Sequence, residues 1–234
     1  LRTADGRARH RPSGLTFNYA DGGMSRGTDC ATWWFAKRLN RPDLLAYFEA
    51  GAFARYCADR PPAGVAAHGN RLFAFTFFWL QPLSAEARPQ GPRDWTSGGH
   101  VPIAVHRTSW DNAAATFVGL KAGSPAGPHG HMDAGSFVFD AHGIRWAYDL
   151  GAESYNRIES RKMDLWSPKQ ESDRWRVFRL SSLSHNTLVI DGQLQLAKGT
   201  ASVVSSCGGP RPETVLDLSP VYTNASRVLR TATL

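Results

Sequence analysis

The stretch that decides the fold is Ser136-Phe-Val-Phe-Asp-Ala-His-Gly-Ile-Arg-Trp-Ala-Tyr-Asp-Leu150. Apolar, aromatic and β-branched residues, which strands favour, dominate residues 136–139 and 144–150. Asp140-Ala-His-Gly143 stands between these two runs and has the composition of a tight turn. We therefore predict a β-hairpin at this point of the chain.

Short segments with strand-like composition continue on both sides of the hairpin. They lie at 101–105, 115–120, 186–190, 202–205, 214–218 and 226–233, and Asp191-Gly192 marks another turn. Short strands joined by short turns indicate an antiparallel sandwich rather than βαβ units. Residues 81–100 are rich in Pro, Gly, Ser and charge, which favours a linker or a long surface loop.

The chain before residue 89 has a helical pattern instead. Thr28 is a candidate N-cap for an apolar stripe that runs to Leu39. Pro42 suits the first position of a second helix, whose apolar spacing continues to Tyr56. Residues 71–80 fit either a third buried helix or a strand. This order of helices and turns is typical of the end of an all-α array.

Composition places the chain among ordinary globular proteins. Of its 234 residues, 42% are hydrophobic and 20% are charged, which excludes wholesale disorder. The formal net charge of +7 favours anionic partners without choosing among nucleic acid, anionic lipid and acidic polymers. Three widely spaced cysteines without a CxxC pair exclude a disulfide scaffold and a thiolate zinc finger.

Neither end of the chain has the features of a natural terminus. The first residue is Leu1, no basic-then-apolar leader follows it, and the last residues are strand-like with no closing turn. No apolar run approaches the ~20 residues that span a bilayer, so we expect no membrane insertion. We therefore expect a piece of a longer protein, truncated at both ends.

Two histidines and an aspartate stand at the ends of predicted strands. His131 lies in the loop before the hairpin, Asp149 ends the hairpin, and His185 directly precedes the segment at 186–190. Imidazole nitrogens and a carboxylate held at three strand ends suit a borderline divalent ion such as zinc. The alternative is that the loop histidines are solvated and that Asp149 caps a turn. His106, beside Arg107 in a predicted strand, is assigned to neither role.

Three motifs in combination resemble a known family. They are H-x-H-x-D-A-G from His129, W-A-x-D-L-G from Trp146, and H-N-T-L-V-I-D-G from His185. Together they resemble the C-terminal β-sandwich of heparinase II/III-like polysaccharide lyases. Residues 14–23 are similar to a late segment of the (α/α) toroid of that family. The resemblance implies an α+β fold, with the helical remnant of a toroid at 1–88 and an incomplete antiparallel β-sandwich at 89–234.

The resemblance also implies an activity and a set of residues. Members of this family cleave uronic-acid-containing polysaccharides by β-elimination, and they are usually exported to the periplasm or secreted. By this resemblance His131, Asp149 and His185 are the zinc ligands, and His129 faces the substrate as a base or charge neutraliser. Tyr155 is the nearest candidate for a catalytic tyrosine after the metal aspartate. The Asn/His pair and the Tyr of the family's earlier toroid helices would lie upstream of this chain.

Basic residues gather between Asp149 and His185. Among them we expect Arg157, Arg174 and Arg176 to bind an acidic substrate, the alternative being a solvated face. We expect Glu153 to pair with an arginine of this stretch. Two tryptophans, Trp166 and Trp175, suit either stacking on sugar rings or a core position.

Two other classes of protein compete with a lyase. His131, Asp133 and His185 reproduce the facial triad of non-haem iron oxygenases. A non-catalytic carbohydrate-binding or structural module that retains the metal site is the second alternative. Nucleic-acid binding is not expected, because only the net charge favours it.

Overall fold

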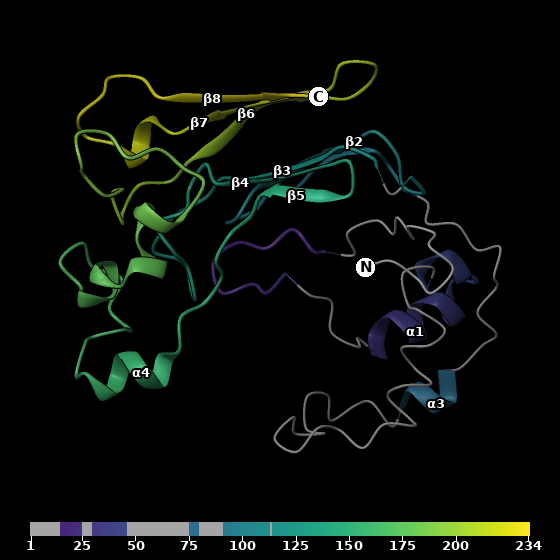
Figure 1. The fold of residues 1–234 in the computed structure, drawn as a ribbon, viewed down its shortest axis with the longest axis horizontal. Helices are drawn as coiled ribbons and strands as arrows, with labels where there is room; N and C mark the ends of the chain where they lie inside the picture. Colours follow the sequence, from purple (N-terminus) through teal and green to yellow (C-terminus); the bar gives the residue numbers. More distant parts are fainter. Residues whose placement is uncertain (1–14, 25–29, 46–74, 80–90, 113) are drawn as a thin grey trace, which may run out of the picture. The chain divides into compact units, whose positions relative to one another are not determined.

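The computed structural model describes residues 15–24, 30–45, 75–79, 91–112 and 114–234 (Figure 1). The chain forms two compact units. One comprises residues 25–91, and the other joins residues 1–24 to residues 92–234. The segment that was expected to be similar to a late toroid segment therefore belongs to the same unit as the sheets.

Short helices form the described part of the first unit. They are α1 (Cys30–Arg38), the 3-10 helix η1 (Pro42–Leu45) and α3 (Thr76–Trp79). Trp33, Ala36 and Leu45 form a small buried cluster, against which Trp79 packs. The predicted helix before Leu39 is confirmed. Of the two alternatives for residues 71–80, a helix or a strand, the described part of that stretch forms the helix α3. The N-cap Thr28 and the stretch from 46 to 62 lie outside the described residues, and the toroid itself stays a prediction.

A five-stranded antiparallel sheet has the order β1-β2-β3-β4-β5, in which each strand pairs with the next along the chain. Its strands are β1 (Asp94–Thr96), β2 (Ile103–Arg107), β3 (Phe117–Lys121), β4 (Phe137–Ala141) and β5 (Ile144–Ala147). The predicted hairpin is β4–β5, and its turn has His142 at φ 54° and Gly143 at φ 76°. Two successive positive φ angles define the turn that matches strand twist.

β1 corrects the expectation of a linker or loop over 81–100 at residues 94–96, while residues 81–90 lie outside the described residues. Asp94 pairs with His106 and Thr96 pairs with Ala104, so this segment forms an edge strand. β1 has only three residues and no apolar alternation, so the sequence offers no pattern that would predict it. It is a strand because it pairs with β2.

A second antiparallel sheet has the order β6-β7-β8. Its strands are β6 (Ser202–Cys207), β7 (Glu213–Asp217) and β8 (Leu229–Thr233). The predicted strand at 186–190 is wrong, because only Ile190 forms a bridge, to Gln193. Side chains hold this segment instead: Asn186 donates to two backbone carbonyls, and Thr187 donates to that of Ala134.

The two sheets form layers around one core. In Figure 1, β6, β7 and β8 lie over the sheet that contains β2 to β5. Both sheets supply the largest buried cluster, which includes Ala104, Val118, Leu120 and Leu216. His106 joins the layers, because its Nδ1 lies 2.8 Å from Asp94 and its Nε2 lies 2.8 Å from Thr214 of β7. An antiparallel β-sandwich is therefore the main architecture of this unit.

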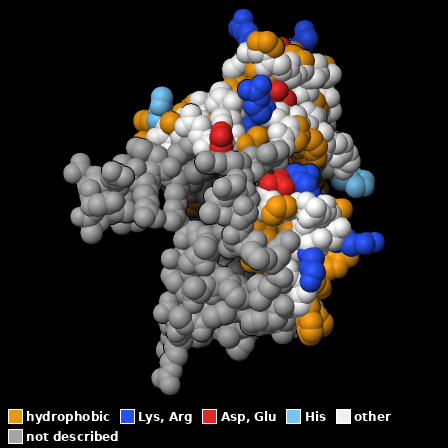
Figure 2. Space-filling model, turned by 90° about the vertical axis from the view of Figure 1, so that its right-hand side faces the viewer, with side chains coloured by type: hydrophobic (Ala, Val, Ile, Leu, Met, Phe, Trp, Pro, Cys, Tyr) orange, Lys and Arg blue, Asp and Glu red, His pale blue; other side chains and the backbone are white. Residues whose placement is uncertain are grey.

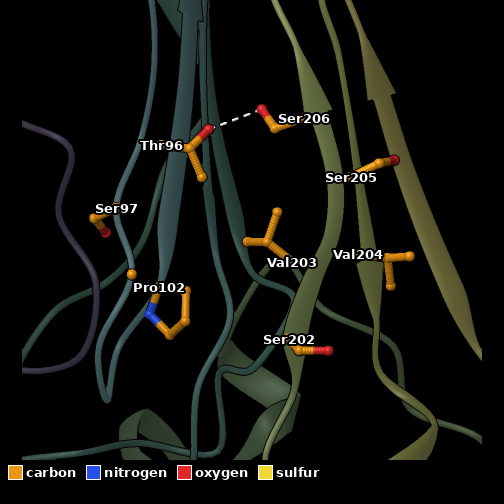
Figure 3. Close-up of a pocket in the computed structure, with 9 residues that line it drawn as sticks. Thr96, Ser97, Pro102, Ser202, Val203, Val204, Ser205 and Ser206 are labelled. Carbon is orange, nitrogen blue, oxygen red and sulfur yellow. Dashed lines mark hydrogen bonds between the residues drawn. The ribbon is translucent and has the colours of Figure 1, made fainter.

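An open groove of about 520 Å³ runs between β1 and β6. Figure 3 shows Thr96 and Ser206 on opposite walls, where the two hydroxyl oxygens lie 2.8 Å apart. Its remaining lining is short hydroxyl and aliphatic side chains, and none of the predicted site residues lines it.

The long connection between β5 and β6 folds around small cores of its own. It contains α4 (Tyr155–Ser160) and the 3-10 helices η3 (Asp173–Arg176), η4 (Phe178–Leu180) and η5 (Ser182–Ser184); η6 (Ser219–Val221) follows β7. Ile158, Leu165 and Leu180 form one of these cores. The connection is thus a packed scaffold for Tyr155, Arg174 and His185. None of the helices described here is both long and apolar enough to cross a bilayer.

Candidate functional site

Asp21 is the centre of the site, and the sequence did not single it out. Its Oδ1 lies 2.9 Å from His131 Nε2, and its Oδ2 lies 2.9 Å from His129 Nδ1. Tyr155 also donates its phenol hydrogen to Oδ2. Three predicted site residues therefore meet on one carboxylate from a distant part of the chain. Its only signal in the sequence is that it lies within residues 14–23, which contribute to the family resemblance.

A buried ion pair anchors the segment that carries Asp21. Lys121 Nζ lies 2.6 Å from Asp133 Oδ1, and the two side chains are 2% and 0% exposed. Asp133 Oδ2 accepts a hydrogen bond from the backbone N–H of Ala20 at 3.0 Å. Two residues before Ala20, the side-chain amide of Asn18 donates a hydrogen bond to the backbone carbonyl of Asp149 at 2.9 Å. These bonds hold the segment against the sandwich and set the position of Asp21.

The two histidines of the loop around Gly130 both contact Asp21 but differ in exposure. His129 has a left-handed backbone, with φ 54°, and its side chain is 61% exposed, whereas that of His131 is fully buried. A Cβ at position 130 would lie 2.5 Å from the carbonyl oxygen of Pro125, so only glycine fits. Arg174 Nη2 donates to the carbonyl of Gly130 at 2.6 Å and fixes the loop from the other side.

The three predicted metal ligands are buried and lie close together. The rings of His131 and His185 are 5.2 Å apart, and His185 Nδ1 lies 2.6 Å from Asp149 Oδ2. His131 Nδ1 and His185 Nε2 are buried without a hydrogen-bond partner. Buried imidazole nitrogens without a hydrogen-bond partner suit a metal ion, so the residues fit zinc in type. Within the described residues, however, no three His, Cys, Asp or Glu side chains converge in a coordinating arrangement.

Electrostatics sets the protonation states in the site. Burial alone would raise the pKa of Asp21, but hydrogen bonds from Tyr155 and both imidazoles outweigh it and hold the pKa below its usual value. Burial lowers the pKa of His131, against the opposing effect of nearby carboxylates, which favours the neutral ring that metals bind. Burial, followed by the hydrogen bond to Asp21, raises the pKa of Tyr155 to about 12.

The predicted substrate-binding arginines separate into two groups. Arg174 is buried in the site, where its charge opposes the rise in the pKa of Tyr155. Arg176 is exposed and pairs with Asp173 at 3.2 Å, while Arg157 is exposed on α4. In Figure 2 basic side chains project from several separate places on the visible described surface. The predicted pairing of Glu153 is confirmed, because Arg179 lies 3.8 Å from it.

The two tryptophans of this stretch have different roles. Trp175 is buried in a small core with Met132 and Ala197. Trp166 is exposed beside His129 and Tyr155.

The ion pair of Asp133 argues against an oxygenase. One carboxylate oxygen is held by Lys121 and the other by the backbone of Ala20. Asp133 is therefore engaged within the core, and we reject the facial triad of His131, Asp133 and His185.

A family of known proteins matches the part of the chain that contains most of the sandwich and the loop of His129 and His131. The family model described as "Heparinase II/III-like, C-terminal" matches residues 91–211, which is more than half of the chain. The chain therefore belongs to the heparinase II/III-like family, in its C-terminal domain. No curated protein sequence matches the chain.

Solved structures share the fold at low sequence identity. The heparan sulfate lyase HepC from Pedobacter heparinus is 16% identical, with a TM-score of 0.53 over 95% of this chain. A mutant of that lyase has a TM-score of 0.54 over 96% of this chain, at 16% identity. A heparinase III gene product, 16% identical, has a TM-score of 0.51 over 95% of this chain. This chain covers 28% of the length of each of these proteins.

Proposed function

We propose that this chain is part of a polysaccharide lyase that cleaves uronic-acid-containing polysaccharides by β-elimination. The observation that carries the proposal is the exposed His129, which contacts Asp21 and Tyr155, with Asp21 also contacting His131 of the buried pair His131 and His185. Membership of the heparinase II/III-like family supports the same class of reaction.

β-Elimination makes two demands on a site. The proton on C5, beside the uronate carboxylate, must be removed, and the C4–O bond to the next sugar must break with a proton supplied to the leaving oxygen. Removing the C5 proton builds negative charge on a group that is already anionic, so positive or hydrogen-bond-donating groups must face the carboxylate. Arg174 is a buried cation of this site, and its charge opposes the rise in the pKa of Tyr155.

His129 has the geometry of the base. Asp21 is ionised, so its carboxylate accepts a hydrogen bond from Nδ1–H of His129. The hydrogen is therefore on Nδ1, and Nε2 keeps its lone pair. With most of the side chain exposed, Nε2 is available to take the C5 proton. Tyr155 keeps its phenol proton at neutral pH because its pKa is about 12. It therefore acts as a hydrogen-bond or proton donor and not as a tyrosinate.

We further propose that His131, Asp149 and His185 hold a zinc ion. The buried, unpartnered nitrogens of His131 and His185 support the two imidazole ligands, and we propose Asp149, which lies 2.6 Å from the other ring nitrogen of His185, as the third. Zinc at this place would supply a fixed positive charge beneath the site. His131 would then link the ion to Asp21, and through Asp21 to His129.

The partner that we propose is an acidic polysaccharide. The net charge of +7 favours an anionic polymer, and Arg174 contacts the loop of His129 and His131, while Arg157 and Arg176 are exposed. Substrates of this kind lie outside the cytoplasm, so we propose a periplasmic or secreted protein.

A non-catalytic carbohydrate-binding module is the second candidate. The observation that favours it is that this chain covers 28% of the fold relatives, so further residues of a lyase site would lie elsewhere. The two candidates differ in chemistry, because a binding module leaves the polymer intact.

The test incubates this chain, and the full-length protein that contains it, with heparan sulfate, hyaluronan and alginate. The readout is the ultraviolet absorbance of the unsaturated uronate that elimination creates. We expect cleavage of at least one polymer by the full-length protein and loss of cleavage in His129→Ala. The matched control is His142→Ala, which removes another exposed histidine at φ 54° from the β4–β5 turn. Undiminished cleavage by His129→Ala, or none of any uronate polymer by the full-length protein, would overturn the proposal.

A further inference from the structure

We propose that Trp166 is a sugar-binding platform beside His129, which stacks on the apolar face of a pyranose ring of the bound polysaccharide. This inference rests on the proposed function for the identity of the polymer alone. The contact itself is argued from the exposure, orientation and neighbours of this one side chain.

Trp166 is not needed to fill the core of its segment. It is 62% exposed. Its neighbour Leu165 is 1% exposed and packs with Ile158 and Leu180 in the small core beneath α4. Because Leu165 already anchors this turn, the exposed indole needs an explanation other than packing. A large exposed aromatic side chain is the kind of residue that binding surfaces use.

Hydrogen bonds fix the orientation of the exposed ring. The indole Nε1–H donates to Glu159 of α4 at 3.0 Å, and the backbone N–H of Trp166 donates to Asp164 Oδ1 at 3.2 Å. Since the only polar atom of the indole is bonded within the protein, the ring offers apolar surface to a ligand. A ring that is already held in place loses little conformational entropy on binding.

Trp166 stands at a right angle to the aromatic pair of the site. His129 and Tyr155 are stacked with 10° between their planes, and their centroids are 5.9 Å apart. The Trp166 ring lies at 85° to both, with its centroid 6.5 Å from that of His129 and 5.4 Å from that of Tyr155. The three rings therefore form a corner, in which Trp166 is one wall and His129 lies on the other.

A pyranose ring matches this corner. Its C–H groups form an apolar face that covers an aromatic ring, whereas its hydroxyl and carboxylate groups point outward around the edge. A sugar whose face lies on Trp166 would direct its edge toward His129, which is where a base must approach a uronate. A specific pocket combines such an apolar anchor with a few polar groups, and here the polar groups are those of the proposed site.

The test measures binding of heparan sulfate, hyaluronan and alginate tetrasaccharides to this chain by calorimetry. We expect Trp166→Ala to weaken the Kd about tenfold, as expected for loss of one aromatic contact. Trp166→Phe keeps an aromatic face and should stay within about threefold of the wild type. The matched control is Trp146→Ala, since Trp146 of β5 is 63% exposed and its indole N–H is likewise bonded, to the carbonyl of Ala141. Because both tryptophans are exposed, both variants are expected to fold, which circular dichroism checks.

Each outcome decides the inference independently of the lyase proposal. A selective loss of binding in Trp166→Ala supports the platform, even if no polymer is cleaved. An unchanged Kd in Trp166→Ala, an equal loss in Trp146→Ala, or no binding of any tetrasaccharide by the wild type would overturn it. Cleavage of a polymer together with an unchanged Kd would leave the lyase proposal standing and remove the platform.

Discussion

The buried ion pair of Lys121 and Asp133 offers the sharpest test of how the site is held. We consider Lys121→Met, which keeps most of the aliphatic stem and removes the ammonium group. Asp133 would then be a fully buried carboxylate whose remaining hydrogen bond, among the residues that the structure describes, is from the N–H of Ala20. Leaving one partner of a buried pair uncompensated costs about 3–5 kcal/mol.

The assay is urea denaturation followed by tryptophan fluorescence and circular dichroism. Lys121→Met should lose about 3–5 kcal/mol of the free energy of unfolding, whereas Lys198→Met, which alters an exposed lysine, should stay within about 0.5 kcal/mol. The double variant Lys121→Met/Asp133→Asn removes both charges, so it should recover part of the loss.

The same variant should also loosen the site. Asp133 holds the backbone next to Asp21, so a shift of that segment would move the carboxylate away from His129 and Tyr155. A loss below about 1 kcal/mol in Lys121→Met would refute the reasoning, as would a double variant as unstable as the sum of the single variants.

Three further predictions concern other polar contacts. His106→Leu should destabilise the sandwich by about 1–3 kcal/mol in urea denaturation, because the His106 ring bonds both layers and Thr214 is buried; a neutral effect would contradict this role. Asp21→Asn should lower the pKa of Tyr155 from about 12, though not fully to 10 since burial is the larger cause, as measured by ultraviolet titration of tyrosinate against Tyr155→Phe. Because the pKa of Tyr155 is higher in the folded protein than in the unfolded chain, Tyr155 contributes stability that is fully present below about pH 10 and is lost as the pH rises toward 12. The fall in the free energy of unfolding between pH 10 and 12 should therefore be smaller in Asp21→Asn than in the wild type. Zinc added to metal-free protein should raise Tm and bind at one ion per chain by elemental analysis, with both effects lost in His185→Ala; an unchanged response in that variant would disprove the ligand set.

The local elements of the fold follow from sequence patterns. The β4–β5 hairpin was predictable because strand-forming residues and a turn ending in Gly143 occur together within a few positions. β6, β7 and β8 were predictable from their strand-like composition, α1 from its apolar stripe, and the turn at Asp191-Gly192 from its two residues. The motifs that begin at His129, Trp146 and His185 together indicate the family, because the residues of each motif are consecutive. In each case the information lies within one short stretch of chain.

The arrangement of the site depended on contacts between stretches that are distant in sequence. Asp21 meets His129 and Tyr155 because its own segment is bonded to Asp133 and to the backbone of Asp149, and no spacing rule relates these positions. The tertiary structure also determines which arginine is buried. One side of the short helix η3 packs against the protein and carries Arg174, whereas the other side is exposed and carries Arg176. Residues 186–190 have strand-like composition, yet side-chain hydrogen bonds replaced a ladder there. Composition determines which local structures are available, whereas burial and hydrogen bonding across the folded chain determine which of them form and which side chains meet.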